Sequence, residues 1–577
     1  MSSNILLKDC FKTYTLDQDK LLTPRETVAR VREQMNRVGL DLMKETRRID
    51  NGRLDIPVYL SILGHDALRV MPTTKQMGKG ATPAQAEASA VMELVERFSF
   101  YYFMSHEPFT LAAYDEVADQ ALPFEHLAAS VHHDPADLSR ARASLQGLKL
   151  SWTPAFNLTR GREYLIPINW FYEINEFNGP AAGNSFEEAL VQGLSELVER
   201  HVSALVSQEE RVLPFIDAAS LKSPAARELV LKFHKQGIRL FVKDFTLGMG
   251  LPTVGALAYD PTTFPHLSEI VYTAGTAPDP EKAYIRALTE VAQLAGDFNS
   301  AATFVASGLP KYANLAQAAY VTGEAPTVGI DRLPDLSHDN LKVEVERIVA
   351  ALAARGFEVY VVNTAHPRLD LPAVYTIVPG AHFRERAQAA SVPFFAAKIL
   401  TQLGDFRAVT AGLSRLQDLY PGKYYLDFFL GQTHLSAGDV PRAIQYLESA
   451  LNLDPLAQDV PGVLTYLGLA HKELEEYERA IGYLERSAEL DQEREDTFNL
   501  LGFCYFKTKQ HEKAIEAFGT VLDINPTSAI DHANIGTNYR ELGRVEEAVE
   551  FYRSALRLDP SLTWVCENLA RLAGKST

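Results

Sequence analysis

The stretch GKGATPAQAEASAVMELVERFSFYYF, residues 78–103, begins with a lysine between two glycines and continues as an amphipathic helix. At about 100° of rotation per residue, Ser89, Glu93 and Glu96 fall on one side of this helix, and Arg97 lies at their edge. The apolar residues fall on the opposite side, so we expect that side to face a core. The sequence therefore predicts a packed helix that carries one strip of charge.

Two further helices repeat this design. The stretch NGPAAGNSFEEALVQGLSELVERHVSAL, residues 178–205, shares the run Glu-Leu-Val-Glu-Arg with the first helix. Its polar side chains gather towards one face: Glu188, Gln192, Glu196, Glu199 and Arg200. In PDPEKAYIRALTEVAQLAG, residues 278–296, one face carries Arg286, Glu290 and Gln293, and the other is apolar. Three helices of one design in a single chain suggest a shared function.

On any single helix, such a strip is more often a solvated face, because Glu-Arg pairs at i,i+4 add only a few tenths of a kcal/mol each. Recurrence favours a second interpretation, in which the three faces converge. That many carboxylates would repel one another unless hard cations lay among them. Mg²⁺ binds oxygen ligands and usually combines a few carboxylates with substrate phosphates, and arginines bind phosphate bidentately. The residues therefore predict a nucleotide triphosphate site held by carboxylates, without the P-loop motif GxxxxGK[ST].

The composition is that of a soluble protein with two or more domains: 577 residues, 46% hydrophobic and 23% charged. A net charge of −18 argues against a non-specific nucleic-acid binder. The three cysteines are too few for a disulfide framework and lack metal-ligand spacing. No secretion signal opens the chain and no apolar run could span a membrane, so we expect a cytoplasmic protein without membrane contact.

Helix and strand patterns interleave through residues 1–388 without a regular βαβ rhythm, which favours an α+β fold. A helix is expected over TPRETVARVREQMNRVGL, where Thr23 is a good N-cap and Pro24 suits the first helical position. Strands are expected within the following ranges: 56–70, 148–158, 162–173, 238–246, 252–260 and 358–383. We therefore predict that residues 1–388 form one α+β domain.

Residues 389–577 read as an all-α solenoid with an internal repeat. Gly431, Gly468, Gly502 and Gly536 recur at spacings of 37, 34 and 34, and an alanine follows each after twelve residues. Prolines close three of the repeats: Pro455, Pro526 and Pro560. This is the tetratricopeptide pattern. We expect an irregular helical pair at 391–420, repeats over about 422–560 and a capping helix at 561–573.

The charged motifs resemble the ATP-binding motifs of the YcaO superfamily over roughly residues 10–388. In order they read Ser89-x3-Glu93-x2-Glu96-Arg97, Asn184-x3-Glu188-x7-Glu196-x2-Glu199-Arg200, and the helix of Arg286, Glu290 and Gln293. The surrounding GKGATPAQAEASA, NGPAAGNSFEEAL and IVPG are also similar to that superfamily. The resemblance implies ATP and Mg²⁺ as cofactors and a YcaO-type catalytic domain.

The resemblance also implies roles for individual residues. Mg²⁺, or the phosphates through it, would be bound by Glu93, Glu96, Glu196, Glu199 and Glu290. The phosphates would be bound by Arg97, Arg200 and Arg286. The nucleotide or metal would be positioned by Ser89, Asn184, Glu188 and Gln293. In KLLTPRETVARV, Lys20 and Thr27 align with a Lys and a Ser that some members use. No catalytic residue is assigned beyond this nucleotide site.

YcaO-type enzymes activate a peptide backbone amide with ATP, so that a nucleophile adds to the amide carbon and forms an azoline, thioamide or amidine. Many azoline-forming members end in a proline-rich tail or carry a leader-peptide-binding domain. This chain ends in Gly574-Lys575-Ser576-Thr577 and shows neither. The resemblance therefore favours the branch linked to ribosomal-protein modification, or a protein thioamidation enzyme, over an azoline-antibiotic cyclodehydratase. The substrate would be a peptide or protein, and the repeats would recruit it or a protein partner.

Two alternatives stay open at this level. The chain could be a nucleotide-sensing adaptor whose repeats recruit partners for another enzyme's modification reaction. The full set of carboxylates and arginines disfavours a pure scaffold, because unpaired buried charges are costly. The repeats could instead mediate homodimerisation.

Overall fold

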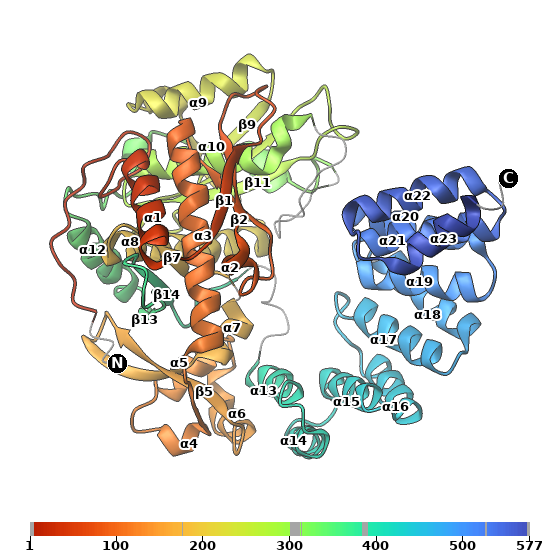
Figure 1. Cartoon of the computed structure of the whole chain (residues 1–577). Coiled ribbons are helices and arrows are strands. Elements are labelled where there is room, and N and C mark those ends of the chain that lie inside the picture. Colours follow the sequence, from red (N-terminus) through yellow and green to blue (C-terminus); the bar gives the residue numbers. More distant parts are fainter. Residues whose placement is uncertain are drawn as a thin grey trace. The chain divides into compact units, whose positions relative to one another are not determined.

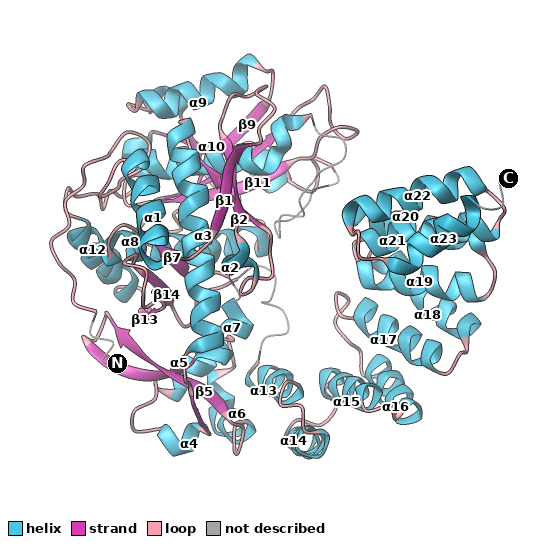
Figure 2. Cartoon of the chain, viewed as in Figure 1, coloured by secondary structure: helices cyan, strands magenta, loops and turns pink. Residues whose placement is uncertain are grey.

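The computed structural model describes residues 5–175, 177–299, 312, 314–383, 391–525 and 528–573. It divides the chain into two compact units, Met1–Val392 and Pro393–Thr577 (Figures 1 and 2). The predicted boundary at 388/389 lies outside the described residues, as do Pro526 and the segment 574–577.

The described strands of the first unit form three sheets, in which neighbours are antiparallel apart from β8 and β12. The first has the order β1 (Met43–Arg48), β2 (Val58–Leu63), β3 (Lys75–Lys79). The second has the order β11 (Val271–Thr276), β10 (Thr253–Tyr259), β9 (Arg239–Asp244), β8 (Phe215–Ile216), β12 (Thr327–Val328). The third has the order β4 (Thr110–Ala112), β5 (Leu150–Asn157), β13 (Tyr360–Asn363), β14 (Ala373–Ile377), β7 (Pro180–Ala182), with β6 (Arg162–Pro167) paired to β5.

The α-helices of this unit are interspersed among the strands, which confirms the α+β prediction. They are α1 (Pro24–Val38), α2 (His65–Leu68), α3 (Pro83–His106), α4 (Tyr114–Val117), α5 (Phe124–Ala129), α6 (Leu138–Ser144), α7 (Ile168–Asn175), α8 (Phe186–Gln208), α9 (Pro224–Lys235), α10 (Pro280–Ala295), α11 (Ala319–Thr322) and α12 (Leu341–Ala353). Within the described residues, no helix is both long enough and apolar enough to traverse a lipid bilayer.

Two strand predictions were wrong in their second halves. The stretch 56–70 was expected to be strand with an intervening turn, but β2 ends at Leu63 and His65–Leu68 forms α2. The strand expected at 162–173 ends at Pro167, and Ile168–Asn175 forms α7. Trp170 and Phe171 of α7 are almost fully buried. A short apolar run has the same composition whether it becomes a buried helix or a buried strand, so its periodicity could not separate the two.

Two of the charged helices lie unusually close to the strands that precede them. A Cβ built on Gly78 of β3 would lie 1.9 Å from the backbone nitrogen of Ala90 in α3. A Cβ built on Gly275 of β11 would lie 2.3 Å from the backbone nitrogen of Ala287 in α10. Only glycine allows this approach of helix to strand. The same strand-to-helix packing is therefore built twice.

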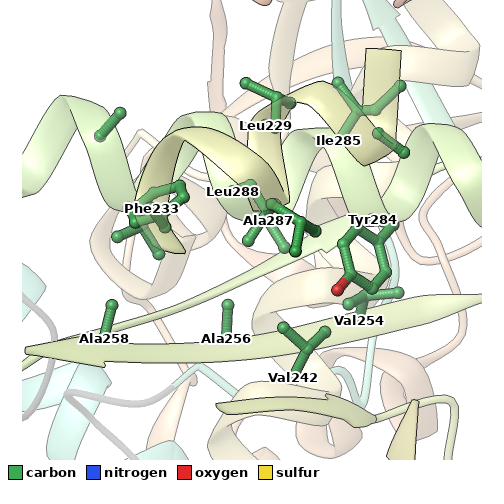
Figure 3. Packing of buried hydrophobic residues seen from close by; sticks show 14 of the residues in the cluster. Leu229, Phe233, Val242, Val254, Ala256, Ala258, Tyr284, Ile285, Ala287 and Leu288 are labelled. Atoms are coloured by element: carbon green, nitrogen blue, oxygen red, sulfur yellow. The ribbon is translucent and has the colours of Figure 1, made fainter. Parts of the chain in front are cut away.

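A hydrophobic core fixes which face of α10 points away from the sheet. Ile285 and Leu288 of α10 are buried in a cluster with Phe233 of α9 and with Val254 and Ala256 of β10 (Figure 3). With the apolar face of α10 held in this way, its polar face is left for the residues of the charged strip.

The second unit consists of paired helices. They are α13 (Val392–Thr401), α14 (Phe406–Leu419), α15 (Tyr424–Ser436), α16 (Val440–Asn452), α17 (Val460–Glu473), α18 (Tyr477–Leu490), α19 (Glu495–Lys507), α20 (His511–Ile524), α21 (Ala529–Glu541), α22 (Val545–Leu558) and α23 (Thr563–Ala573). The repeated glycines lie where paired helices cross: a Cβ at Gly468 would lie 2.5 Å from Leu484, and one at Gly502 would lie 2.6 Å from Phe518. The repeat therefore reflects close helix packing.

Candidate functional site

The three charged faces converge on a cavity of about 300 Å³ in the first unit. Its lining comes mainly from α3, α8 and α10, together with residues from the N-terminal segment, α1 and the end of β3. Every residue predicted for the site lines this cavity: Lys20, Thr27, Ser89, Glu93, Glu96, Arg97, Asn184, Glu188, Glu196, Glu199, Arg200, Arg286, Glu290 and Gln293. The placement of these residues agrees with the sequence, and their individual roles stay predictions.

Helix α3 contributes two neighbouring carboxylates and an arginine. The Nε of Arg97 lies 3.4 Å from Glu96 Oε1 and 3.9 Å from Glu93 Oε1. Arg97 also donates from Nη1 to the carbonyl oxygen of Phe177 at 3.1 Å, which fixes its guanidinium. Burial raises the pKa of Glu93 and raises that of Glu96 well above its ordinary value, while Arg97 opposes both shifts. The attraction of Arg97 therefore does not fully offset the free-energy cost of burying these two carboxylates in their charged form.

The start of α8 is held in a polar network with α1. The side-chain amide of Asn184 donates to Thr27 Oγ1 at 3.0 Å and to Glu188 Oε1 at 3.1 Å. Glu188 in turn accepts the backbone N–H of Leu21 at 2.9 Å, and Lys20 Nζ lies 4.0 Å from its Oε1. Thr27, Asn184 and Glu188 are all buried. This end of the cavity is therefore rigid and rich in hydrogen-bonding groups.

Further along α8, Glu196, Glu199 and Arg200 face the cavity. Glu199 accepts the backbone N–H of Thr276, at the end of β11, at 3.0 Å. Arg200 lies 3.9 Å from Glu196, whose pKa is raised by burial although Arg200 attracts its charged form. On α10, Arg286 donates to Gln192 of α8 at 2.7 Å. These contacts join α8 to both β11 and α10.

Lys79 is the residue whose importance the sequence did not reveal. It ends β3 and forms an ion pair with Glu290. Burial, followed by the nearby charge of Arg286, lowers the pKa of Lys79 to about 8, while Glu199 and Glu93 attract its charged form. The available signal was a lysine between two glycines in front of the first charged helix, a motif too short to be a P-loop. In the structure this lysine lies among the carboxylates.

The donor set fits a polyanion and a hard cation bound together. Three polar atoms of cavity residues are buried without a hydrogen-bond partner: Arg200 Nε, Arg286 Nε and Asn184 Oδ1. No three acidic, histidine or cysteine side chains of the described residues come close enough to hold a metal ion by themselves. A Mg²⁺ ion here would therefore need phosphate oxygens in addition to carboxylates, which is its usual mode of binding to nucleotides.

The chain matches models of two known families. A model described as YcaO cyclodehydratase, ATP- and Mg²⁺-binding, matches residues 77–382, more than half of the 577 residues. Tetratricopeptide-repeat models match residues 463–494 and 493–561. ATP and Mg²⁺, the predicted cofactors, are thus those of the matched family.

Individual proteins are also similar to this chain. A Methanothermobacter thermautotrophicus protein of uncharacterised function is 30% identical over 384 residues, 62% of this chain and 93% of its own length. The Escherichia coli ribosomal protein S12 methylthiotransferase accessory factor YcaO is 30% identical over 241 residues, 37% of this chain and 40% of its own length. A heterocyclase solved with substrate and cofactor is 23% identical with a TM-score of 0.53, covers 66% of this chain and 54% of its own, and shares the fold.

Proposed function

Because the chain belongs to the YcaO family of ATP- and Mg²⁺-binding proteins, we propose that it activates a backbone amide of a peptide or protein at the expense of ATP. The amide oxygen attacks a phosphoryl group of ATP, and the activated amide carbon then accepts a nucleophile. The convergence of the three charged helices on one cavity carries this proposal. Thioamidation, azoline formation and ribosomal-protein modification are the candidate outcomes.

The carboxylates and the arginines of the cavity would have different roles in this reaction. Glu93 and Glu96 from α3, with Glu196 and Glu199 from α8 and Glu290 from α10, would hold Mg²⁺ together with phosphate oxygens. The bound metal supplies charge neutralisation at the phosphates. The guanidinium groups of Arg97, Arg200 and Arg286 would donate to phosphate oxygens and stabilise charge on the departing phosphate. The catalytic contribution is therefore positioning and electrostatics.

The polar end of the cavity would recognise the rest of the nucleotide. Asn184 and Glu188 are held by Thr27 and Leu21, so their orientation is set before any ligand binds. Lys20, Ser89 and Gln293 line the same cavity and would complete the contacts. Such preorganisation lowers the cost of ordering the site on binding.

ATP turnover by two variants tests the site assignment. Glu96→Gln and Arg200→Ala should each abolish Mg²⁺-dependent ATP hydrolysis while the circular dichroism spectrum stays unchanged. Glu33→Gln removes a carboxylate from the exposed face of α1 and serves as the matched control. Normal turnover by both site variants would disprove the assignment.

The repeats are proposed to recruit the protein substrate or a partner through the surfaces that tetratricopeptide solenoids offer to peptides. Mass spectrometry of proteins from cells with and without this chain would identify the product. Loss of a water mass indicates azoline or amidine chemistry, and replacement of oxygen by sulfur indicates a thioamide. No mass difference in any protein would contradict enzymatic modification.

An adaptor is the second candidate, because one relative is named an accessory factor of a methylthiotransferase. In that role the first unit would sense nucleotide while another enzyme performs the modification. ATP consumption with and without a candidate partner separates the two. Strict absence of turnover in both conditions favours the adaptor.

A further inference from the structure

Residues 5–22, here termed the strap, contribute Gln18, Lys20 and Leu22 to the wall of the cavity. The strap contains no helix and no strand longer than an isolated bridge. A segment without its own hydrogen-bonded element takes its position from the contacts it makes with the rest of the protein. The position of Lys20 and Gln18 at the cavity therefore depends on where the strap is attached.

One set of attachments joins the strap to the start of α8. The backbone N–H of Lys8 donates to Glu187 Oε1 at 2.6 Å, and the backbone N–H of Leu21 donates to Glu188 Oε2 at 2.9 Å. Between them, the Sγ of Cys10 lies 3.2 Å from the Oγ of Ser185, the N-cap of α8. Both ends of the strap are thus held against the same helix.

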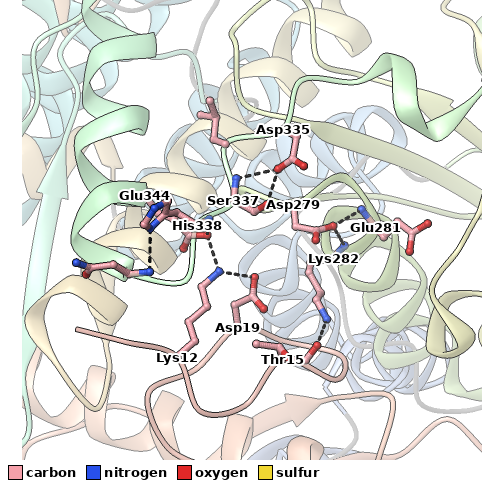
Figure 4. Close-up of polar contacts among 12 residues, drawn as sticks. Lys12, Thr15, Asp19, Asp279, Glu281, Lys282, Asp335, Ser337, His338 and Glu344 are labelled. Carbon is pink, nitrogen blue, oxygen red and sulfur yellow. Dashed lines mark hydrogen bonds and ion pairs between the residues drawn. The ribbon is translucent and has the colours of Figure 1, made fainter. Parts of the chain in front are cut away.

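A second set joins the strap to α12. Lys12 Nζ donates to Glu344 Oε1 at 2.6 Å and to Asp19 Oδ2 at 2.9 Å (Figure 4). The side chain of Lys12 is 5% exposed and that of Glu344 is fully buried. The backbone N–H of Cys10 donates to Asn340 Oδ1 at 2.9 Å. Because both side chains are buried, loss of Lys12 leaves the Glu344 carboxyl without this hydrogen-bond donor, and it also removes the link between α12 and Asp19 of the strap.

A third set reaches the two remaining walls of the cavity. Lys282 of α10 extends its ammonium group to the carbonyl oxygens of Thr15 and Leu16, the latter at 2.8 Å (Figure 4). Asp17, which is fully buried, accepts the backbone N–H of Ala81 at 3.1 Å. Ala81 follows Lys79 by two residues, so this bond links the strap to the loop between β3 and α3.

We propose that Lys12, Asp17 and Lys282 are positioning residues for the nucleotide site: they fix the strap to α12, to the loop before α3 and to α10, and so hold Lys20 and Gln18 where the nucleotide binds. None of the three lines the cavity, so each acts through the strap. This inference rests on the proposed function of the cavity as an ATP site. A purely structural strap would affect stability and leave nucleotide affinity unchanged.

The first test measures binding of the ATP analogue AMPPCP with Mg²⁺ by calorimetry on the full-length protein. Lys12→Met and Lys282→Met should each weaken binding by about tenfold or more, the scale of one lost hydrogen bond to a charged group. Lys8→Met is the matched control, because Lys8 lies on the strap, is exposed and contacts α8 through its backbone. Equal affinity of all three variants and the wild type would overturn the positioning role.

A covalent rescue separates misplacement of the strap from general damage. Ser185→Cys would place a thiol beside that of Cys10, within reach of a disulfide after a small adjustment. In the Lys12→Met background, oxidation should restore affinity for Mg²⁺–AMPPCP and reduction should weaken it again. Addition of Cys10→Ser removes the crosslink and should abolish the rescue. If the oxidised protein binds as weakly as the reduced one, the strap does not act by position.

Binding by the wild-type protein separates failure of the proposed ATP site from failure of the positioning role of the strap. If it fails to bind Mg²⁺–AMPPCP, the proposed function of the cavity is wrong, and the role of the strap falls with it. If it binds and the Lys12 and Lys282 variants match the Lys8 control, the ATP site stands and the positioning role alone is wrong.

Discussion

Replacement of Glu344 by glutamine should change how the stability of the first unit depends on pH. Glu344 lies on α12 with its side chain fully buried, accepts from Lys12 and from the backbone N–H of His338, and keeps a second oxygen without a hydrogen-bond partner. Burial raises its pKa from 4.5 to about 7, although Lys12 opposes the shift. The folded protein therefore retains a proton that the unfolded chain loses at lower pH.

The magnitude follows from linkage between protonation and folding. Between pH 4.5 and about 7 the folded state binds more protons at Glu344 than the unfolded state does, so this group's contribution to stability is full below 4.5 and is lost as the pH rises to about 7. At about 1.36 kcal/mol for each pH unit, the loss is about 3 kcal/mol. Glutamine does not titrate. The free energy of unfolding of Glu344→Gln relative to the wild type should thus rise by about 3 kcal/mol between pH 4.5 and 8.

Urea unfolding followed by tryptophan fluorescence measures this difference for the first unit alone. The protein has three tryptophans. Trp152 and Trp170 are buried in the first unit, and Trp564 lies in α23 of the second. In a Trp564→Phe background, shared by both proteins, the fluorescence therefore reports only on the first unit. A difference between variant and wild type that does not change with pH would refute the assignment of a protonated buried carboxyl.

Four further substitutions have direct readouts. Lys79→Met leaves the carboxylate cluster without its ammonium group and should lower the free energy of unfolding of the first unit by about 2 kcal/mol, as measured by urea unfolding. A value equal to that of the wild type would contradict the location of Lys79 among the carboxylates. Gly275→Ala should destabilise the first unit by about 3 kcal/mol, because its Cβ would meet the backbone of α10, and a wild-type Tm would show that α10 can move away freely. Gly502→Ala should lower the Tm of the repeats, because its Cβ would press on Phe518. Gly519→Ala is the matched control: its Cβ would meet no atom within 4 Å, so it should raise the stability of the repeats by about 1 kcal/mol. The opposite order of the two Tm values would contradict the packing of α19 on α20.

Local patterns predicted most of the residues that line the cavity. The charged residues occupy one face of each helix: Glu93 and Arg97 on α3, and Glu196 and Arg200 on α8. The periodicity of the sequence predicts this face because the apolar side of each helix must be buried in the folded protein. The repeats were also predicted from the sequence, because the spacing from Gly468 to Gly502 is set by the packing of one helical pair on the next.

The remaining features depend on contacts between distant parts of the chain. The bond from Lys12 to Glu344 joins residues 332 positions apart, and no local period records it. The position of Lys79 depends on the packing of α10 against β3, and the helical state of Trp170 depends on tertiary burial. Such features are decided by the fold as a whole.

Calorimetric titration of the full-length protein with AMPPCP, in the presence and absence of Mg²⁺, tests the central claim most directly. The wild type should bind the nucleotide in a manner that depends on Mg²⁺, and both Glu199→Gln and Arg286→Met should abolish that binding, while Glu33→Gln binds as the wild type does. Binding that is indifferent to Mg²⁺, or that survives intact in both site variants, would contradict the assignment of the three-helix cavity as the ATP site.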